Sequence, residues 1–542
     1  HCSLKSGKNK GMQIERISFD KIPQFSNRDR QYQTNPETFS DFIKYMPTED
    51  GLLQAARDRK SFTTDRNLLV SVLEEHYKSF KIEDLQKENL LALADENTFT
   101  IITAHQPCLF TGPLYYVTKL FSAVNLSKRL NNNNEGFKFV PVFINGSEDH
   151  DFEEVASLNI YNKSVSWQTE QTGPVGRMEL DGLEKALEDL VGVMGTGETA
   201  TTIKEKIKAC LYTCNNYNDF VFKFVNVFFG YTGILVFTMD DPALKKAFIP
   251  IMKKEILEEA SLESVQNTQA KIEELLGYKA QAFARPINLF YLSDGNRGRI
   301  ERDGEGFIII DSNKRFTEDE LMVELEAHPE SFSPNVVLRP LFQEFILPNV
   351  AYVGGGGELA YWMERKQQFQ DFGIFFPTLI RRNSLMIISK SQNQMLSKVG
   401  FSIDEIFALE DDLIRTYLER KSHGELDLSL ENEQISKIMN DISEKAEAID
   451  PTLKNAVLAE ANKIGKQVEQ IESRIRRSLK QQEETQVNQI KTLKSKLFAG
   501  NGLQERTDNF FQFYLSMGEK LTEQFESLLD PLDKEFLVLV DE

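Results

Sequence analysis

One segment of the 542-residue chain crowds five acidic side chains around a single histidine, His150. The segment runs from Asn145 to Glu154. Acidic neighbours raise a histidine's pKa and orient its ring, which makes an acid or base that works near neutral pH. We therefore predict His150 as the catalytic base, with Glu148 as its substitute and Asp149 or Asp151 holding the ring. The same carboxylates could bind a divalent metal, and the plain alternative is an acid-rich, capped first turn of a helix.

A second candidate is the loop that runs from Thr111 through Gly112 to Tyr115, with Lys119 one turn further on. Thr111 can cap the following helix, and Gly112 lets a ligand approach the backbone. Since a helix N-terminus offers unpaired N–H groups and a partial positive charge, we expect this loop to bind a phosphate or a carboxylate. Helix capping without any ligand is equally compatible with these residue types.

A run of four glycines, Gly354, Gly355, Gly356 and Gly357, precedes Glu358 between an apparent strand end and a helix start. Successive backbone amides at such a place form an anion-binding nest. The run matches neither the Walker sequence nor the GxGxxG fingerprint, because the Lys-Ser/Thr pair is missing and the glycine spacing differs. It therefore predicts an anion site without identifying a nucleotide.

Two arginines flank this glycine run in the sequence. Arg339 and Gln343 lie upstream, and Arg382 and Ser384 follow a later predicted strand. Guanidinium groups bind carboxylates and phosphates with two parallel hydrogen bonds, so we expect these residues to contribute to the substrate or nucleotide site. A structural ion pair is the alternative for each arginine.

Composition narrows the setting. A formal net charge of −20 disfavours nucleic acid as a partner, and no apolar run approaches the ~18 residues of a membrane span. We therefore expect neither nucleic acid nor a membrane as a partner. The four cysteines are too few for a disulfide framework, so we expect a cytoplasmic protein. Cys108 has no evident base partner and is predicted to be a buried small hydrophobe, and His105 beside it receives no role.

These loops need a scaffold, and the hydropathy pattern of the chain predicts a parallel α/β fold. Leu114 to Leu130 carries apolar residues at helical spacing, and Asn131 to Asn134 ends that run. Ligands bind at the carboxyl ends of the strands in such folds. After a first strand from Met12 to Ile17, strands of an open sheet are expected at 99–103, 137–144, 233–237, 288–292, 349–353 and 373–376.

The chain divides into four predicted parts: an extension outside the fold (1–11), a core with inserted subdomains (12–389), a helical coiled-coil domain (390–500) and a C-terminal helical segment that packs on the core (501–542). In the third part, apolar residues recur at spacings of three and four, and Asp450-Pro451 separates two antiparallel helices. The second helix is expected from Leu453 to Leu497, roughly 65 Å long, with a weak seam at Ser478 and Gln482. This length indicates an arm or a dimerisation device.

Taken together, the order and spacing of several motifs resemble the BshC family of bacillithiol biosynthesis. The resemblance covers about Met12 to Glu542, and it departs from the usual family pattern at Ala104 to Cys108 and in the unbroken glycine run. The motifs are Thr111 to Tyr115 with Lys119, Glu148 to Glu154, Asp240-Asp241-Pro242, Glu301 to Gly304, Arg339 to Glu344, Gly354 to Trp362, Arg382-Asn383-Ser384 and Leu503 to Arg506.

The resemblance implies a Rossmann-like, parallel-sheet core with connecting subdomains and a C-terminal α-helical antiparallel coiled coil that forms a homodimer. It implies a cysteine ligase that joins L-cysteine to the glucosamine amine of glucosaminyl malate, with Gln504 and Arg506 as candidates for a second site. Amide formation from a free carboxylate is uphill in water, so activation is expected, with ATP/ADP as the nucleotide pair and the requirement for Mg left open.

Two other functions remain open at this point. The chain could be a nucleotide-binding scaffold or chaperone of a thiol-making complex, with its coiled coil recruiting partners. The other function is tRNA or nucleotidyl transfer, because the core also resembles that of class I aminoacyl-tRNA synthetases, with Thr111 to Lys119 in the place of their HIGH-type loop. The paired histidines of that loop are absent, and the net charge of −20 does not indicate a basic docking surface for tRNA.

Overall fold

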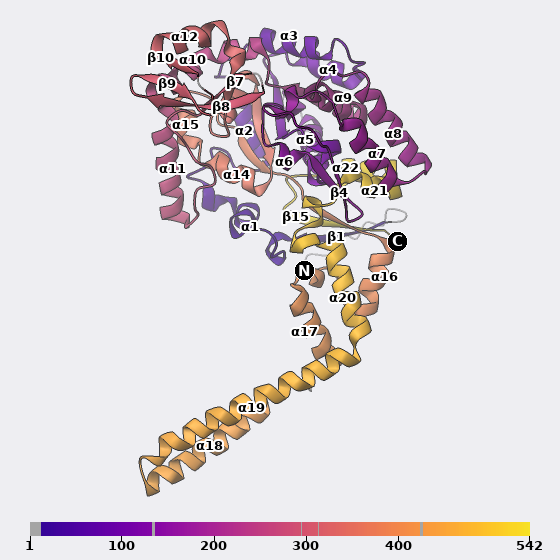
Figure 1. Cartoon of the computed structure of the whole chain (residues 1–542), viewed down its shortest axis with the longest axis vertical. Helices are drawn as coiled ribbons and strands as arrows, with labels where there is room; N and C mark the ends of the chain where they lie inside the picture. Colours follow the sequence, from indigo (N-terminus) through magenta and orange to yellow (C-terminus); the bar gives the residue numbers. More distant parts are fainter. Residues whose placement is uncertain (1–11, 133–135, 294, 313, 423–425, 542) are drawn as a thin grey trace.

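The structure is a computed structural model that describes residues 12–132, 136–293, 295–312, 314–422 and 426–541. The predicted extension, residues 1–11, lies outside the described residues. Figure 1 shows a body of sheets and helices from which a long helical arm projects. Within the described part of the chain, no helix combines the length and the apolar character that a membrane crossing needs.

Five parallel strands form the central sheet, in the order β13-β12-β2-β3-β6. Numbered along the chain, this order is that of a Rossmann fold, with its switch point between the first strand, β2, and the fourth, β12. Nearly all residues of these strands are buried, as a parallel sheet covered on both faces requires. The strands are β2 (Thr98–His105), β3 (Lys138–Asn145), β6 (Leu235–Thr238), β12 (Asn349–Gly354) and β13 (Thr378–Arg381).

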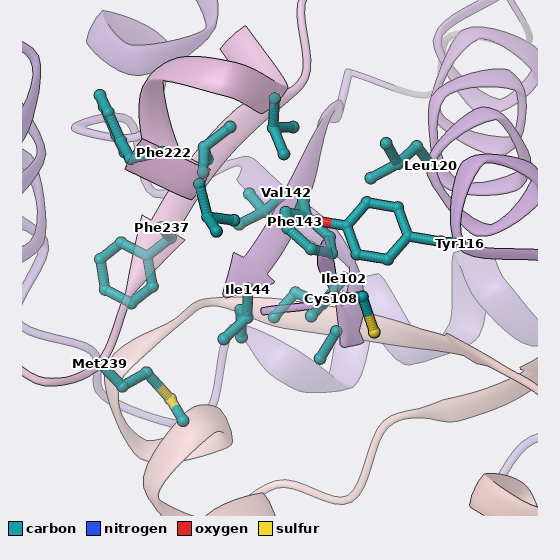
Figure 2. Packing of buried hydrophobic residues seen from close by; sticks show 14 of the residues in the cluster. Ile102, Cys108, Tyr116, Leu120, Val142, Phe143, Ile144, Phe222, Phe237 and Met239 are labelled. Carbon is teal, nitrogen blue, oxygen red and sulfur yellow. The ribbon is translucent and has the colours of Figure 1, made fainter. Parts of the chain in front are cut away.

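The helix predicted after the first strand is α5 (Tyr115–Asn132), which packs on β2 and β3. In Figure 2, Tyr116 of α5 lies beside Phe143 of β3, and their ring centroids are 5.2 Å apart. The helix ends within the predicted Asn131 to Asn134 stop, of which residues 133–134 lie outside the described residues. The four expected strands at 99–103, 137–144, 233–237 and 349–353 are confirmed, and so is the Rossmann-like core.

Two predicted members of that sheet are wrong. Residues 288–292 form a strand, β7 (Leu289–Ser293), but it belongs to an inserted antiparallel sheet ordered β10-β9-β8-β7-β11. Residues 373–376 form no strand, because Phe376 packs its ring against Trp362 and Phe369, so this apolar run reflects burial rather than strand pairing. The other inserted strands are β8 (Asn296–Asp303), β9 (Gly306–Ile309), β10 (Arg315–Thr317) and β11 (Phe332–Pro334).

The two ends of the described chain meet in a third sheet. The predicted first strand is confirmed as β1 (Met12–Ser18), which pairs antiparallel with β15 (Glu535–Asp541), and β15 pairs in parallel with β14 (Leu385–Ile388). The C-terminal segment is helical, as predicted, in α21 (Phe510–Met517) and α22 (Glu519–Leu528). The prediction is wrong from Glu535 onward, since a continuous apolar run buried between two neighbouring strands forms a central strand instead.

The arm is a pair of antiparallel helices, α18 (Ser429–Ile449) and α19 (Leu453–Gln482), joined by a short turn (Figure 1). The coiled-coil prediction is thereby confirmed. The single helix expected from Leu453 to Leu497 is wrong, because the chain breaks at Glu483 and continues as α20 (Glu484–Leu497). α20 packs on α16 (Lys390–Val399) and α17 (Glu410–Lys421), which join the arm to the body.

The remaining helices surround the sheets. They are α1 (Asn27–Thr34), α2 (Glu49–Arg59), α3 (Arg66–Tyr77), α4 (Asp84–Ala92), α6 (Phe152–Val155), α7 (Leu183–Met194), α8 (Glu198–Leu211), α9 (Tyr217–Phe229), α10 (Pro242–Glu258), α11 (Ala260–Leu276), α12 (Glu318–Ala327), α13 (Arg339–Ile346), α14 (Gly356–Met363) and α15 (Lys366–Asp371), with the hairpin of β4 (Ser157–Ile160) and β5 (Lys163–Ser166) between α6 and α7.

Candidate active site

A cleft of about 1010 Å³ opens at the carboxyl edge of the central sheet. His105 ends β2, Asn145 ends β3 and Gly355 follows β12, and all three line the cleft. This is the switch point of the sheet, where ligands bind in open parallel folds. Phe290 and Arg297 of the inserted antiparallel sheet line the cleft as well, so this insertion forms part of its wall.

The predicted site residues divide between the cleft and its surroundings. Those that line the cleft are Tyr115, Glu148, Asp149, Arg339, Gly355, Gly356, Gly357, Glu358, Arg382 and Arg506. Those that do not line it are Thr111, Gly112, Lys119, His150, Asp151, Gln343, Gly354, Ser384 and Gln504. Segments far apart in the sequence thus converge on the cleft, while the predicted residues that do not line it make contacts within the protein.

The Thr111-Gly112 loop is buried and held by the C-terminal segment. The Asn509 side-chain amide donates to Thr111 Oγ1 at 3.2 Å and to Gly112 O at 2.6 Å. A Cβ on Gly112 would lie 2.7 Å from the Cys108 Cβ, so the glycine permits close packing rather than ligand approach. The prediction that Thr111 caps α5 is wrong, since the amide of Leu114, next to the helix start, donates to a backbone carbonyl of the C-terminal segment.

Lys119 supports the cleft from behind. It is buried, and its Nζ donates to Ala104 O and to Glu358, both at 2.7 Å. Burial opposes ionisation of Glu358, but the Lys119 charge and a hydrogen bond from the Gly355 amide outweigh it and hold the pKa of Glu358 at about 2. The Lys119 charge is therefore offset within the protein, contrary to the expectation that it binds an anion.

The glycine run carries the chain from β12 into α14. The Gly355 amide donates to Glu358 Oε2 at 2.8 Å. Gly356 and Gly357 occupy the first turn of α14, where amides have no preceding helical carbonyl to bind. Both residues line the cleft, so the N-terminus of α14 with its partial positive charge borders it, and the anion nest stays a prediction.

Arg382 adjoins this run and keeps one donor open. Its Nη1 and Nη2 donate to the two carboxylate oxygens of buried Glu505 at 3.0 and 2.9 Å. Its Nε is buried and has no partner among the described residues. A Cβ on Gly355 would lie 3.7 Å from this Nε, so the open donor lies next to the glycine run. An unpaired buried N–H beside a helix N-terminus fits a carboxylate or phosphate ligand.

Three residues predicted to bind ligands hold other groups in place instead. Ser384 accepts a hydrogen bond from Arg382 Nη1 at 3.2 Å, and Gln343 accepts one from Arg339 Nη1 at 3.1 Å. The Gln504 side chain pairs with the main chain of β14 at 2.8 and 3.0 Å. All three side chains are buried and paired, so they position the arginines and strands that surround the cleft.

The opposite wall of the cleft is acidic and rests on a buried lysine. Lys245 Nζ donates to Glu148 Oε1 at 2.5 Å and to Asp240 Oδ1 at 3.0 Å, and its side chain is 1% exposed. Arg177 donates twice to Asp240, at 2.7 and 2.8 Å. Burial opposes ionisation of Asp240, but Lys245 and Arg177 lower its pKa to about 2. Glu148 and Asp240 therefore face the cleft as supported carboxylates.

Asp149 and Glu154 stand beside this pair. The Gln106 amide nitrogen donates to Asp149 Oδ2 at 2.8 Å and to Glu154 Oε2 at 3.0 Å. Burial opposes ionisation of Asp149, but the hydrogen bonds from Gln106 and from the Asp151 amide hold its pKa below the usual value. All three bridged groups line the cleft, so two carboxylates share one neutral donor there.

His150 is not among the lining residues and lies at the edge of the cleft, where its ring centroid is 5.5 Å from that of the lining residue Phe290 and its side chain is 46% exposed. Arg297 Nη1 donates to His150 Nδ1 at 3.0 Å, so that ring nitrogen is an acceptor already in use. Partial burial and the Arg297 charge lower the His150 pKa, although Asp149 and Asp151 act against them. The expectation that acidic neighbours raise this pKa is therefore wrong, because the arginine from the inserted sheet could not be anticipated from the local sequence.

His105, which is partly buried, and Cys108, which is buried, lie together at the end of β2. His105 Nε2 lies 3.1 Å from the Tyr115 hydroxyl, and its Nδ1 lies 3.5 Å from Cys108 Sγ. Burial, with the nearby Lys119 charge, lowers the His105 pKa to about 3, so the ring is neutral. Burial also raises the Cys108 pKa to about 12, which agrees with the prediction of a small hydrophobe rather than a nucleophile.

Sequence reasoning missed Lys245, Gln106 and Arg297. Lys245 follows the Asp240-Asp241-Pro242 motif by one helical turn, which is the signal that could have linked it to Asp240. Nothing in the local sequence marks Gln106 or Arg297. Within the described ranges, no group of three His, Cys, Asp or Glu side chains is placed to hold a metal ion, so the acidic segment offers no such ligand set.

Two family models match this chain. The model described as Bacillithiol biosynthesis BshC, N-terminal Rossmann-like domain matches residues 12–383. The model described as Bacillithiol biosynthesis BshC, C-terminal coiled-coil domain matches residues 385–540. Together they span both the body and the arm.

Several relatives match over nearly their whole length, each named “Putative cysteine ligase BshC”. The Flavobacterium johnsoniae protein is 34% identical over 97% of this chain and 100% of its own. The Christiangramia forsetii protein is 35% identical over 96% and 98%, and the Bacillus mycoides protein is 27% identical over 91% and 95%. A Campylobacter jejuni structure titled as a putative arginyl-tRNA synthetase is 11% identical and covers 80% of this chain and 94% of its own. Its TM-score of 0.21 is too low to indicate a shared fold.

Proposed function

This chain belongs to the BshC family of bacillithiol biosynthesis, and from that premise we propose that it is a ligase that joins the carboxyl group of L-cysteine to the amine of glucosaminyl malate. The observation that supports this proposal is that two walls meet in one cleft, one with carboxylates beside Arg297 and one with guanidinium groups and glycine amides beside Glu358. Glu148 and Asp149 line one side, and Arg339, Arg382 and the glycine run line the other.

This division suits an amide-forming reaction between small polar substrates. An acidic wall attracts an amine, and an arginine-rich wall with open amides attracts carboxylates or phosphates. Both substrates of the proposed reaction carry an amine and at least one carboxylate. A cleft of about 1010 Å³ also has room for more than one small molecule, which a joining reaction requires.

ATP is the proposed activating cosubstrate, since a free carboxylate does not form an amide in water without activation. Bound ATP would supply the phosphoryl or adenylyl group that makes the cysteine carboxyl reactive. The Arg382 Nε and the amides of Gly356 and Gly357 fit a phosphate there. Asp29 abuts Gly356, but Arg381 offsets its charge with hydrogen bonds of 3.0 and 3.1 Å.

Glu148 is the proposed acceptor of the proton that the substrate ammonium group must lose before its nitrogen can attack the activated carboxyl group. It lines the cleft, and only one of its two oxygens is occupied by Lys245 among the described residues. His150, the first candidate from the sequence, has its Nδ1 occupied by Arg297 and does not line the cleft. A base must reach the proton it removes, so geometry favours Glu148.

The arm is the proposed contact with a second copy of the chain. α19 has no buried residue, and aliphatic side chains along the hairpin remain exposed, among them Ile438 at 58% and Ile471 at 50%. A homodimer would cover this surface. The proposed setting is the cytoplasm, in keeping with the free thiols of Cys108, Cys210 and Cys214.

The direct test is an incubation of the purified full chain with cysteine and glucosaminyl malate, with and without ATP and magnesium. We expect a product whose mass equals the sum of the two substrates minus one water, formed when ATP and magnesium are present. The absence of this product under every condition would overturn the ligase and favour a scaffold role.

A further inference from the structure

An unpaired carbonyl oxygen lies at the centre of the acidic wall. Asn145 is 2% exposed, and its side-chain nitrogen donates to Asn218 Oδ1 at 3.0 Å. Its Oδ1 is buried and accepts no hydrogen bond from any described residue, although Asn145 lines the cleft. Leaving a buried acceptor unsatisfied costs roughly 1–3 kcal/mol, so this oxygen calls for a donor that the protein itself does not provide.

The strand register brings the acidic groups to the same place. Asn145 of β3 pairs with His105 of β2 on one side and with Thr238 of β6 on the other. Ser147 Oγ and Thr238 Oγ1 lie 3.0 Å apart, which ties the loop after β3 to the end of β6. Glu148 therefore comes within reach of Lys245, and both Glu148 and Asn145 face one cleft.

Two carboxylates beside Asn145 also keep acceptor capacity. Glu148 Oε2 receives no hydrogen bond from a described residue, since Lys245 binds the other oxygen. Asp149 shares the single Gln106 nitrogen with Glu154, and its other hydrogen bond comes from the Asp151 amide. Glu148 Oε2 and Asn145 Oδ1 thus remain open acceptors at this wall among the described residues.

The number of open acceptors selects the chemistry of the ligand. A hydroxyl group donates one hydrogen bond, whereas a protonated primary amine donates three and carries a positive charge. Carboxylates favour the charged donor, and hydrogen bonds to charged groups are about twice as strong as neutral ones. An amine therefore satisfies this wall, and a hydroxyl does not.

We propose that Asn145, Glu148 and Asp149 form the subsite for the amine of the amino-sugar substrate, with buried Lys245 as the positioning residue that holds Glu148. This assignment rests on the proposed function. Lys245 does not line the cleft, so it acts through Glu148 and Asp240 rather than on the substrate. Arg297, which does line the cleft, donates to His150 and to Ser333 and Pro334 beside this wall.

The separation of the two walls favours the amino sugar over cysteine as the ligand that spans them. β3 and β12 are two strand spacings apart in the sheet, roughly 10 Å. In glucosaminyl malate two neighbouring ring carbons, the glycosidic oxygen and the malate carbon chain lie between the amine and the malate carboxylates. In cysteine both charged groups are bonded to the same carbon, so cysteine spans a shorter distance across the cleft than glucosaminyl malate does.

The test compares the affinities of two probes by calorimetry, using the full chain without ATP so that no turnover occurs. The probes are glucosaminyl malate and the analogue in which a hydroxyl replaces the amine. The wild-type chain should prefer the amine at least about tenfold. Glu148→Gln and Asn145→Ala should each lower the affinity for the amine about 10–100-fold and leave the affinity for the hydroxyl analogue within about twofold.

Lys245 and a nearby acid provide the matched controls. Lys245→Met should lose the preference for the amine, Lys245→Arg should retain most of it, and Glu153→Gln, an exposed acid of the same segment, should leave it unchanged. Equal affinities of the wild-type chain for both probes, or equal losses for both probes in Glu148→Gln, would overturn the subsite. If the wild-type chain forms product but Glu148→Gln keeps the wild-type preference for the amine probe, the subsite alone is overturned. If Glu148→Gln loses that preference but the wild-type chain forms no product, the ligase alone is overturned.

Discussion

At the cleft, charged side chains such as Lys245 and Arg382 are buried and paired, whereas along the α18–α19 hairpin aliphatic side chains such as Ile449 remain exposed. Burying a charge is costly unless partners surround it, and exposing aliphatic surface forfeits hydrophobic stabilisation. The cleft region thus buries charges that proteins usually expose, and the hairpin exposes aliphatic side chains that proteins usually bury. The cleft leaves a few hydrogen-bonding valences open for small ligands, and the hairpin leaves an apolar surface open for another chain.

The largest expected effect separates two acidic-segment residues that the sequence cannot rank. Glu148→Gln should reduce product formation about 10²–10⁴-fold, because the cleft loses its proton acceptor. His150→Ala should stay within about tenfold of the wild-type rate, since its ring lies at the edge of the cleft with Nδ1 occupied by Arg297. Initial rates measured by product mass decide the matter. The reverse ranking would restore His150 as the base, and equal turnover by both variants would remove the base from this segment altogether.

The next effect tests how much the free energy of unfolding falls when the buried Arg382–Glu505 ion pair is broken. Arg382→Ala leaves Glu505 buried without its bidentate partner, so the free energy of unfolding should fall by about 3–5 kcal/mol. The matched control is Arg415→Ala in α17, an exposed partner of Asp412, which should lose at most about 1 kcal/mol. Chemical denaturation gives both values, and similar losses in the two variants would contradict the contrast.

A pH-dependent effect is expected from Glu344, which lies buried in α13 behind the cleft. Burial raises its pKa to about 8, although hydrogen bonds from Asn349 and Gln343 act against this shift. The folded chain therefore keeps this proton up to about pH 8, whereas the unfolded chain releases it near 4.5. Stability from this group is complete at the acidic end of that window and is lost as pH rises through it.

Glu344→Gln should remove this dependence. The variant should gain stability relative to the wild type between pH 5 and 8, by up to about 1.4 kcal/mol per pH unit. Urea denaturation across that pH range measures the difference, with Glu258→Gln as an exposed control that should show no trend. A constant difference between Glu344→Gln and the wild type would show that the carboxyl group is ionised throughout.

The smallest effect on the folded chain is expected at the hairpin. Ile438→Glu with Ile471→Glu places charges on the exposed aliphatic surface, so a dimer should dissociate in sedimentation experiments. The free energy of unfolding of the monomer should change by no more than about 0.5 kcal/mol, because neither side chain is buried within the chain. Identical sedimentation of the variant and the wild type would mean that this surface does not join two copies.

The positions of the strands and the arm follow from sequence periodicity, whereas pairing partners do not. Residues 99–103 and 349–353 were predictable as strands because their buried, apolar runs end at polar or glycine turns. The run at 373–376 is also apolar, but the Phe376 ring packs on Trp362 and Phe369 without strand pairing, which local sequence does not encode. β15 likewise becomes a strand through pairing with β1 and β14, far away in the chain.

The candidate site shows the same limit at the level of single side chains. Motifs that place a residue at the end of a parallel strand, such as Glu148 and Gly355, were predictable because strand ends meet at one edge. Residues two positions further along can serve other contacts, as His150 does after Glu148 and Ser384 does after Arg382. Lys245 and Arg297 come from other elements, and their effects on Glu148 and His150 depend on tertiary contacts alone.

The central claim is that the cleft joins an activated cysteine carboxyl group to the sugar amine. The most direct test supplies cysteine labelled with ¹⁸O in both carboxyl oxygens, together with glucosaminyl malate, ATP and magnesium, and follows the label by mass spectrometry. We expect one labelled oxygen in the amide product and the other in the phosphate or AMP that is released. A chain that forms no product, or releases the second labelled oxygen into water, would contradict this account.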